Sequence, residues 1–193
     1  DLAGSKQPIG APGLISSVDL SPDGNYIMVD LIKKPFSYLV PWSSFAEKTV
    51  VCDKTGKLVQ EIDNRPASDN LPKGFMSTHK YKRSISWRDD KPATLIYVLA
   101  LDGGDPENKV DYRDEVFSME APFKAGTEKS LLKTQQRFSG IEWGKEDLAI
   151  AYDYWYNTRN MKTYIFNPSN PSVTPVILWD RNYQDRYTEP GDF

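Results

Sequence analysis

The chain has 193 residues, a net charge of −3 and 26% charged residues of both signs, which is ordinary for a soluble globular protein. No basic stripe is present, which excludes nucleic acid as an expected partner, and no apolar run reaches the ~18 residues of a membrane span. A single cysteine, Cys52, rules out an internal disulfide, and with only one histidine the sequence indicates neither a zinc site nor any other cofactor. Aromatic residues reach 12% and favour β-structure, because large flat side chains pack well on pleated surfaces.

Short apolar or alternating runs, separated by clusters of Gly, Pro, Asn and Asp, predict twelve β-strands in three groups of four. The first group is expected at 14–20, 26–32, 48–53 and 58–62, the second at 83–88, 95–101, 115–120 and 129–133, and the third at 138–143, 148–154, 162–167 and 174–179. Helical periodicity is almost absent. The sequence therefore predicts an all-β protein.

A local pattern recurs near the start of each group: an aliphatic residue, a polar residue, a large apolar residue, a polar turn and a second apolar strand. It begins at Val18, Ile85 and Ile141. The repeats are longer than the ~40–50 residues of compact propeller repeats, and two long loops, 33–47 and 102–114, explain the excess.

Four short strands per repeat predict a partial β-propeller of about three four-stranded antiparallel blades, at 14–63, 83–134 and 137–181, within a single segment 1–193. A β-sandwich remains the alternative, although a sandwich needs no internal similarity. The terminal blades of an open arc would each keep one apolar face uncovered, which predicts self-association through residues such as Ile27 and Val29 at one end and Ile177 at the other.

Six segments carry a family resemblance: PFSYLVP (35–41), SISWRDDKPATL (84–95), ALDGGDP (100–106), VFSMEAPF (116–123), RFSGIEWG (137–144) and DRYTEPG (185–191). In this order they resemble the N-terminal propeller of prolyl oligopeptidase-family serine peptidases, closest to the glutamyl endopeptidase-like branch. The resemblance extends over 15–193.

The resemblance implies a function without a catalytic residue in this chain. In that family a C-terminal α/β-hydrolase domain carries the nucleophile in a G-x-S-x-G elbow. This sequence has no such motif and ends before a hydrolase domain would begin, and its start at Asp1 rather than Met fits an excised or processed piece. We therefore expect a non-catalytic segment that gates and positions peptide substrate for the parent peptidase, with an exported or periplasmic location as one option. The alternative is a stand-alone propeller-like module that binds a protein or ligand and has no enzymatic activity.

Three basic residues are candidates for binding an acidic substrate side chain, as a glutamate-preferring peptidase would require: Arg137, Arg159 and Lys162. An arginine fork suits a carboxylate. A solvated, exposed side chain is the alternative for all three, at a hairpin tip for Arg159 and Lys162, because charged residues are mostly exposed.

The long loop after the second strand is unusually apolar and offers Phe36, Tyr38 and Trp42 as contacts to the missing hydrolase domain or a neighbouring blade. The acidic loop 102–107 is the best metal candidate, but its spacing does not fit an EF-hand and its Gly-Gly and Asp-Pro pairs are ordinary turn chemistry, so no metal is expected. The lone His79 falls in an interblade loop, without the spacing of a catalytic triad.

Overall fold

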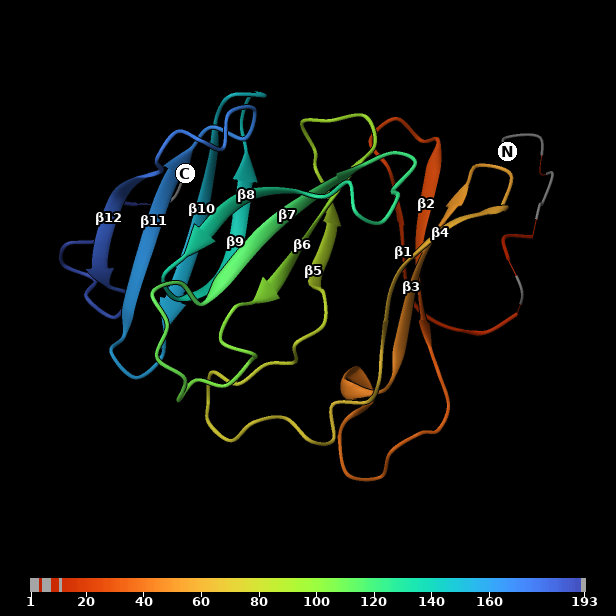
Figure 1. The fold of residues 1–193 in the computed structure, drawn as a ribbon, viewed down its shortest axis with the longest axis horizontal. Helices are drawn as coiled ribbons and strands as arrows, with labels where there is room; N and C mark the ends of the chain where they lie inside the picture. The colour runs from red at the N-terminus through yellow and green to blue at the C-terminus, as the bar shows by residue number, and fades with distance from the viewer. Residues whose placement is uncertain (1–3, 5–7, 11, 192–193) are drawn as a thin grey trace. The chain divides into compact units, whose positions relative to one another are not determined.

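The computed structural model describes residue 4, residues 8–10 and residues 12–191. It contains all twelve expected strands in three four-stranded antiparallel sheets, and the strands of each sheet follow one another in chain order (Figure 1). The predicted fold class, all-β with three propeller-type blades, is confirmed. Within the described ranges, no helix is long and apolar enough to cross a membrane.

The strand bounds are as follows. The first sheet holds β1 (Leu14–Leu20), β2 (Tyr26–Ile32), β3 (Glu47–Asp53) and β4 (Leu58–Arg65), with the single-turn 3-10 helix η1 (Trp42–Ser44) between β2 and β3. The second holds β5 (Arg83–Trp87), β6 (Thr94–Ala100), β7 (Asp114–Glu120) and β8 (Lys129–Thr134). The third holds β9 (Arg137–Trp143), β10 (Ala149–Trp155), β11 (Asn160–Phe166) and β12 (Val176–Asn182).

The largest difference from the expected bounds is at β12, which starts after Pro175 rather than at residue 174. Proline has no N–H to donate to a strand ladder, so pairing begins at the next residue. The strand then runs on to Asn182, which pairs with Asn160 at the start of β11.

The chain divides into two compact units, each considered separately below. One comprises residues 1–71, 81–97 and 118–129, and the other comprises residues 72–80, 98–117 and 130–193. The division passes through β6, β7 and β8, so the first sheet lies wholly in one unit and the third sheet wholly in the other.

In the first unit, the central strands β2 and β3 supply a cluster of buried side chains, Ile27, Val29, Val50 and Cys52. Ile27 and Val29 are therefore covered, although the sequence suggested that they would lose cover. Each lies on a central strand and pairs in register with one residue of β1 and one residue of β3. The more exposed apolar side chains of this sheet lie on its edge strands, β1 and β4. There Val18, Leu20 and Leu58 are each more than half exposed. Self-association through this sheet face stays a prediction.

The second unit is built on the alternation of β10. Ala149, Ala151 and Asp153 are buried on one face, together with Tyr164 and Phe166 of β11 opposite them. The intervening residues are half-buried on the other face. This alternation is the period-two pattern of a strand whose two faces have different surroundings.

The equivalent tryptophans near the starts of the second and third groups differ in burial. Trp87 is 5% exposed and packs edge-on against the buried ring of Phe123, with 5.7 Å between centroids. Trp143, the last residue of β9, is only half-buried.

Trp87→Ala should lower the free energy of unfolding by about 3–5 kcal/mol, because it removes a core aromatic whose space cannot fully collapse. Trp143→Ala is the matched control and should cost less. Urea unfolding of both variants measures the difference, and a loss at Trp143 equal to or larger than that at Trp87 would contradict the assignment of the core.

Candidate functional site

Arg137, the first residue of β9, is buried in the second unit, with 5% of its surface exposed. Its guanidinium forms a bidentate pair with Asp102, from Nη1 to Oδ1 at 2.9 Å and from Nη2 to Oδ2 at 2.7 Å. Nη1 also donates to Oδ1 of Asp114 at 3.1 Å, and Nε donates to the carbonyl of Met76 at 2.9 Å. Arg137 therefore joins the loop 72–80 to both ends of the loop 101–113.

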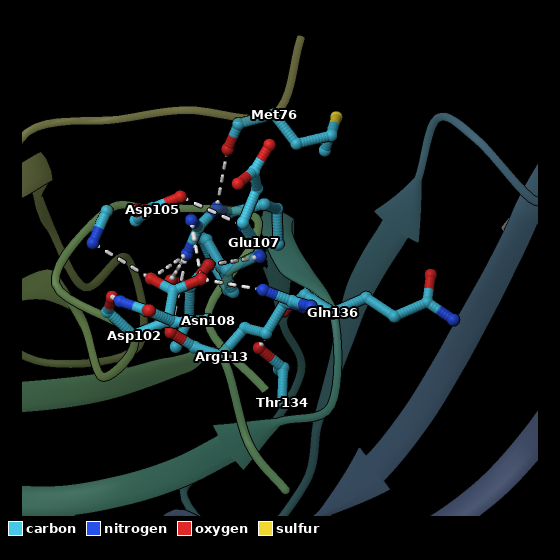
Figure 2. Close-up of polar contacts among 12 residues, drawn as sticks. Met76, Asp102, Asp105, Glu107, Asn108, Arg113, Thr134 and Gln136 are labelled. Carbon is cyan, nitrogen blue, oxygen red and sulfur yellow. Dashed lines mark hydrogen bonds and ion pairs between the residues drawn. The ribbon is translucent and has the colours of Figure 1, made fainter. Parts of the chain in front are cut away.

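A second arginine completes this group, which we call the Asp102 cluster: Asp102, Arg113, Asp114 and Arg137. Arg113 donates from Nη1 to Oδ2 of Asp102 at 2.8 Å, as Figure 2 shows. Both carboxylate side chains are 0% exposed. Two carboxylates and two guanidinium groups balance in charge, which is what allows them to be buried together.

The backbone around Asp102 is fixed by the same group. Its Oδ1 accepts the N–H of Gly104 at 2.9 Å, and its carbonyl accepts the side-chain amide of Asn108 at 2.8 Å (Figure 2). Gly104 has φ +84°, and a Cβ there would lie 2.0 Å from the carbonyl oxygen of Thr78, so only glycine fits. Thr78 in turn donates its N–H to the carbonyl of Gly104 at 3.0 Å.

The acidic loop 102–107 is the best candidate for a metal site in the sequence. In the structure it is a turn whose first carboxylate, Asp102, is hydrogen-bonded to Arg113 and Arg137. In the part of the chain that the structure describes, no group of three or more His, Cys, Asp or Glu side chains is arranged to hold a metal ion. His79 lies half-buried in the neighbouring loop 72–80.

Next to the Asp102 cluster lies a group of stacked side chains, the aromatic–arginine surface: Phe75, Trp155, Tyr156 and Arg159. Phe75 stacks on Tyr156 with 3.9 Å between centroids, and the guanidinium of Arg159 lies 3.7 Å from the centroid of the same ring. Phe75 and Arg159 therefore both contact the ring of Tyr156. The guanidinium of Arg113 lies 4.0 Å from the Trp155 ring, so Arg113 joins this surface to the cluster.

The turn between β10 and β11 positions Arg159. The backbone of Arg159 has φ 57°, a left-handed conformation unusual for a residue with a side chain. Its N–H donates to the carbonyl of Tyr156 at 3.3 Å, and Nη1 donates to the hydroxyl of Tyr183 at 3.2 Å. The hydrogen bonds to Tyr183 and Tyr156 raise the pKa of Arg159.

The three basic residues singled out from the sequence have different partners, and no contact brings them together. Arg137 is neutralised by two buried carboxylates. Lys162 donates to the side chain of Gln135 and forms an ion pair with Asp180 at 3.3 Å. Arg159 has no carboxylate partner among the described residues. It is therefore the cation best placed to meet an acidic group from outside.

A pocket of about 220 Å³ opens beside the aromatic–arginine surface. Its lining residues are Lys73, Gly74, Phe75, Met76, Pro106, Glu107, Arg113, Trp155 and Asn157. Three loops that are remote in sequence therefore meet at this pocket: 72–80, 101–113 and the β10–β11 turn.

The sequence-predicted contact loop belongs to the first unit. Tyr38 is fully exposed, Trp42 is 63% exposed and Phe36 is 42% exposed. Phe36 stacks on Phe45 with 5.7 Å between centroids. The loop thus keeps large apolar side chains in solvent, as a contact surface would, while its partner stays a prediction.

Sequence reasoning missed the partners of Arg137 and the stacking on Tyr156. Asp102 and Asp114 bracket one loop, which is a weak signal that both could reach a common arginine. Phe75 gave no signal, because its contact to Tyr156 joins positions 81 residues apart in the sequence.

Comparisons with known proteins agree with the resemblance found in the sequence. The chain is 39% identical over 189 residues to a probable chloroplastic glutamyl endopeptidase of Oryza sativa subsp. japonica, and 37% identical over 191 residues to one of Arabidopsis thaliana. These alignments cover 97% and 98% of this chain but 20% of each relative, so the chain spans about a fifth of their length. The expected relation to the glutamyl endopeptidases is confirmed. No family model matches the chain.

Solved structures are less similar. The β-propeller domain of the Trilobed protease from Pyrococcus furiosus aligns with 87% of this chain and 42% of its own, at 11% identity and a TM-score of 0.46. The acylaminoacyl peptidase of Pyrococcus horikoshii aligns with 80% of this chain and 24% of its own, at 14% identity and a TM-score of 0.44.

Arg137→Met should lower the free energy of unfolding by about 3–5 kcal/mol, because it leaves two buried carboxylates without their main partner. Lys129→Met is the control, since Lys129 and Glu120 form an ion pair with both side chains about two-thirds exposed. It should change stability by no more than about 0.5 kcal/mol. Urea unfolding of both variants measures this. Equal, small losses would show that the cluster is not needed for folding.

Asp153 predicts a pH dependence of stability. It is 0% exposed, and its Oδ2 accepts hydrogen bonds from the hydroxyl of Tyr164 at 2.7 Å and the N–H of Gln136 at 2.9 Å. Burial raises the pKa of Asp153 above its ordinary 3.8, and the Tyr164 hydrogen bond and the charge of Lys162 only partly oppose this. The folded state therefore binds this proton more tightly than the unfolded state does.

The stabilisation from that proton is fully present below pH 3.8 and is lost as the pH rises through the higher folded-state pKa. Asp153→Asn removes the titration. The free energy of unfolding of the unchanged protein minus that of the variant should fall across this window and then level off. A difference that is flat or rises with pH would contradict the expected direction.

Proposed function

Because the chain is homologous along its length to part of the glutamyl endopeptidases, we propose that it is a non-catalytic propeller segment of a serine peptidase. In this proposal, residues 1–193 form a single segment that gates and positions peptide substrate, and the C-terminal α/β-hydrolase domain of the parent lies outside them. Peptide hydrolysis belongs to the parent, since no G-x-S-x-G motif is present in this chain.

The observation that supports substrate contact most directly is the state of Arg159. Its guanidinium is held by Tyr183 and stacked on Tyr156, yet no carboxylate among the described residues neutralises it. A planar cation fixed in this way has lost part of its rotamer freedom before a ligand binds, so less entropy is lost on binding. It suits the side-chain carboxylate of a peptide glutamate or aspartate.

The other two basic residues contribute differently. Lys162 already has an acidic partner in Asp180, so a substrate carboxylate would have to compete for it. Arg137 is buried, and its guanidinium is already hydrogen-bonded to Met76, Asp102 and Asp114. It would therefore affect substrate binding only indirectly, by holding the loops 72–80 and 101–113 in place. We therefore assign direct contact to Arg159, a weaker contribution to Lys162 and a positioning role to Arg137.

The exposed apolar loop supports a contact to the rest of the longer protein. Tyr38, Trp42 and Phe36 are large exposed side chains of one loop, and exposed apolar surfaces of this kind normally mark interaction sites. We assign them to the interface with the hydrolase domain.

Arg159→Gln should weaken binding of a glutamate-containing peptide by about fivefold, the size of one good exposed ion pair, and should leave the matched glutamine peptide unaffected. Fluorescence anisotropy with labelled peptides measures both affinities, and mass spectrometry of the same samples should show the peptides intact. Lys129→Gln, an exposed lysine on β8, is the control. Loss of preference for glutamate in the control, or its retention in Arg159→Gln, would refute the assignment.

A further inference from the structure

Two aromatic rings, those of Phe75 and Tyr156, connect the 220 Å³ pocket to Arg159. Phe75 lines the pocket and stacks on Tyr156, and the guanidinium of Arg159 lies 3.7 Å from the centroid of the same Tyr156 ring. Tyr156 and Phe75 therefore link Arg159 to the pocket. At 220 Å³ the pocket is smaller than the ~300–1,000 Å³ of sites for whole small molecules, so it suits a single side chain.

The polar groups that line the pocket are mostly donors. Asp102 takes one of the five N–H donors of Arg113. The other four have no partner among the described residues, and the guanidinium lies 4.0 Å from the centroid of the Trp155 ring. Lys73 has no ion-pair partner in the same part of the chain, and Asn157 adds a side-chain amide.

The remaining lining is apolar apart from one acidic side chain. Phe75, Met76, Pro106 and Trp155 can cover the methylene groups of a side chain, and Glu107 is the single carboxylate in the lining. Because Glu107 is exposed, its repulsion of an anion is screened by water, whereas Arg113 is largely buried.

We propose, building on the function proposed above, that this pocket is a second subsite for an acidic side chain. The segment would then prefer peptides that carry two acidic residues, one on Arg159 and the other on Arg113 and Lys73. The Asp102 cluster builds this subsite, since it holds Arg113 on Trp155 and holds Met76 against Arg137.

The test uses labelled Glu-x-Glu and Glu-x-x-Glu peptides and the matched peptides in which either or both glutamates are glutamine. In fluorescence anisotropy, the second glutamate should strengthen binding about fivefold for at least one spacing. Lys73→Gln should remove most of that second increment and keep the first. Glu107→Gln should enlarge the second increment, because it removes the one opposing charge. Both positions are exposed loop residues, so neither variant should perturb folding.

Arg159→Gln separates this inference from the proposed function. If Arg159→Gln weakens binding while a second glutamate adds nothing, or while Lys73→Gln and Glu107→Gln leave affinity unchanged, the second subsite is refuted and the proposed function stands. If Arg159→Gln has no effect but Lys73→Gln and Glu107→Gln shift affinity in opposite directions, the pocket binds acidic groups and the role of Arg159 is refuted.

Discussion

The bidentate pair between Arg137 and Asp102 is the interaction on which the second unit depends. The two side chains come from positions 35 residues apart, and around them gather a carbonyl of the loop 72–80, the second arginine Arg113 and the second carboxylate Asp114. Removing water from charges is costly, so such a group is stable only when every member has its partners. That requirement fixes the two loops to the start of β9 in one arrangement.

Arg113 connects the buried pair of Arg137 and Asp102 to the aromatic–arginine surface. Its Nη1 donates to buried Asp102, and its guanidinium lies 4.0 Å from the centroid of Trp155, the last residue of β10. Phe75, one residue before Met76, stacks on Tyr156 of the β10–β11 turn. The Asp102 cluster and the aromatic–arginine surface are thus connected through Arg113 and through the loop 72–80. These contacts give a defined geometry to the loops 72–80 and 101–113, which have little regular structure.

Environment, not residue type, separates the basic side chains. Arg137 and Arg159 are chemically identical, yet one is buried between carboxylates and the other lies on a tyrosine ring without an acidic partner. The relatives match nearly the whole of this chain and are about five times its length.

The sequence by itself determined the strands, their grouping and the relation to glutamyl endopeptidases, because these depend on local alternation, turn residues and ordered motifs that are read directly along the chain. It also singled out Arg159 and the loop at Tyr38 as candidates, and their roles stay predictions. Only the tertiary structure decided that Arg137 is neutralised by Asp102 and Asp114, and that Phe75 meets Tyr156. These contacts join distant positions through side-chain direction and loop path, and no periodicity in the sequence encodes which charge will face which.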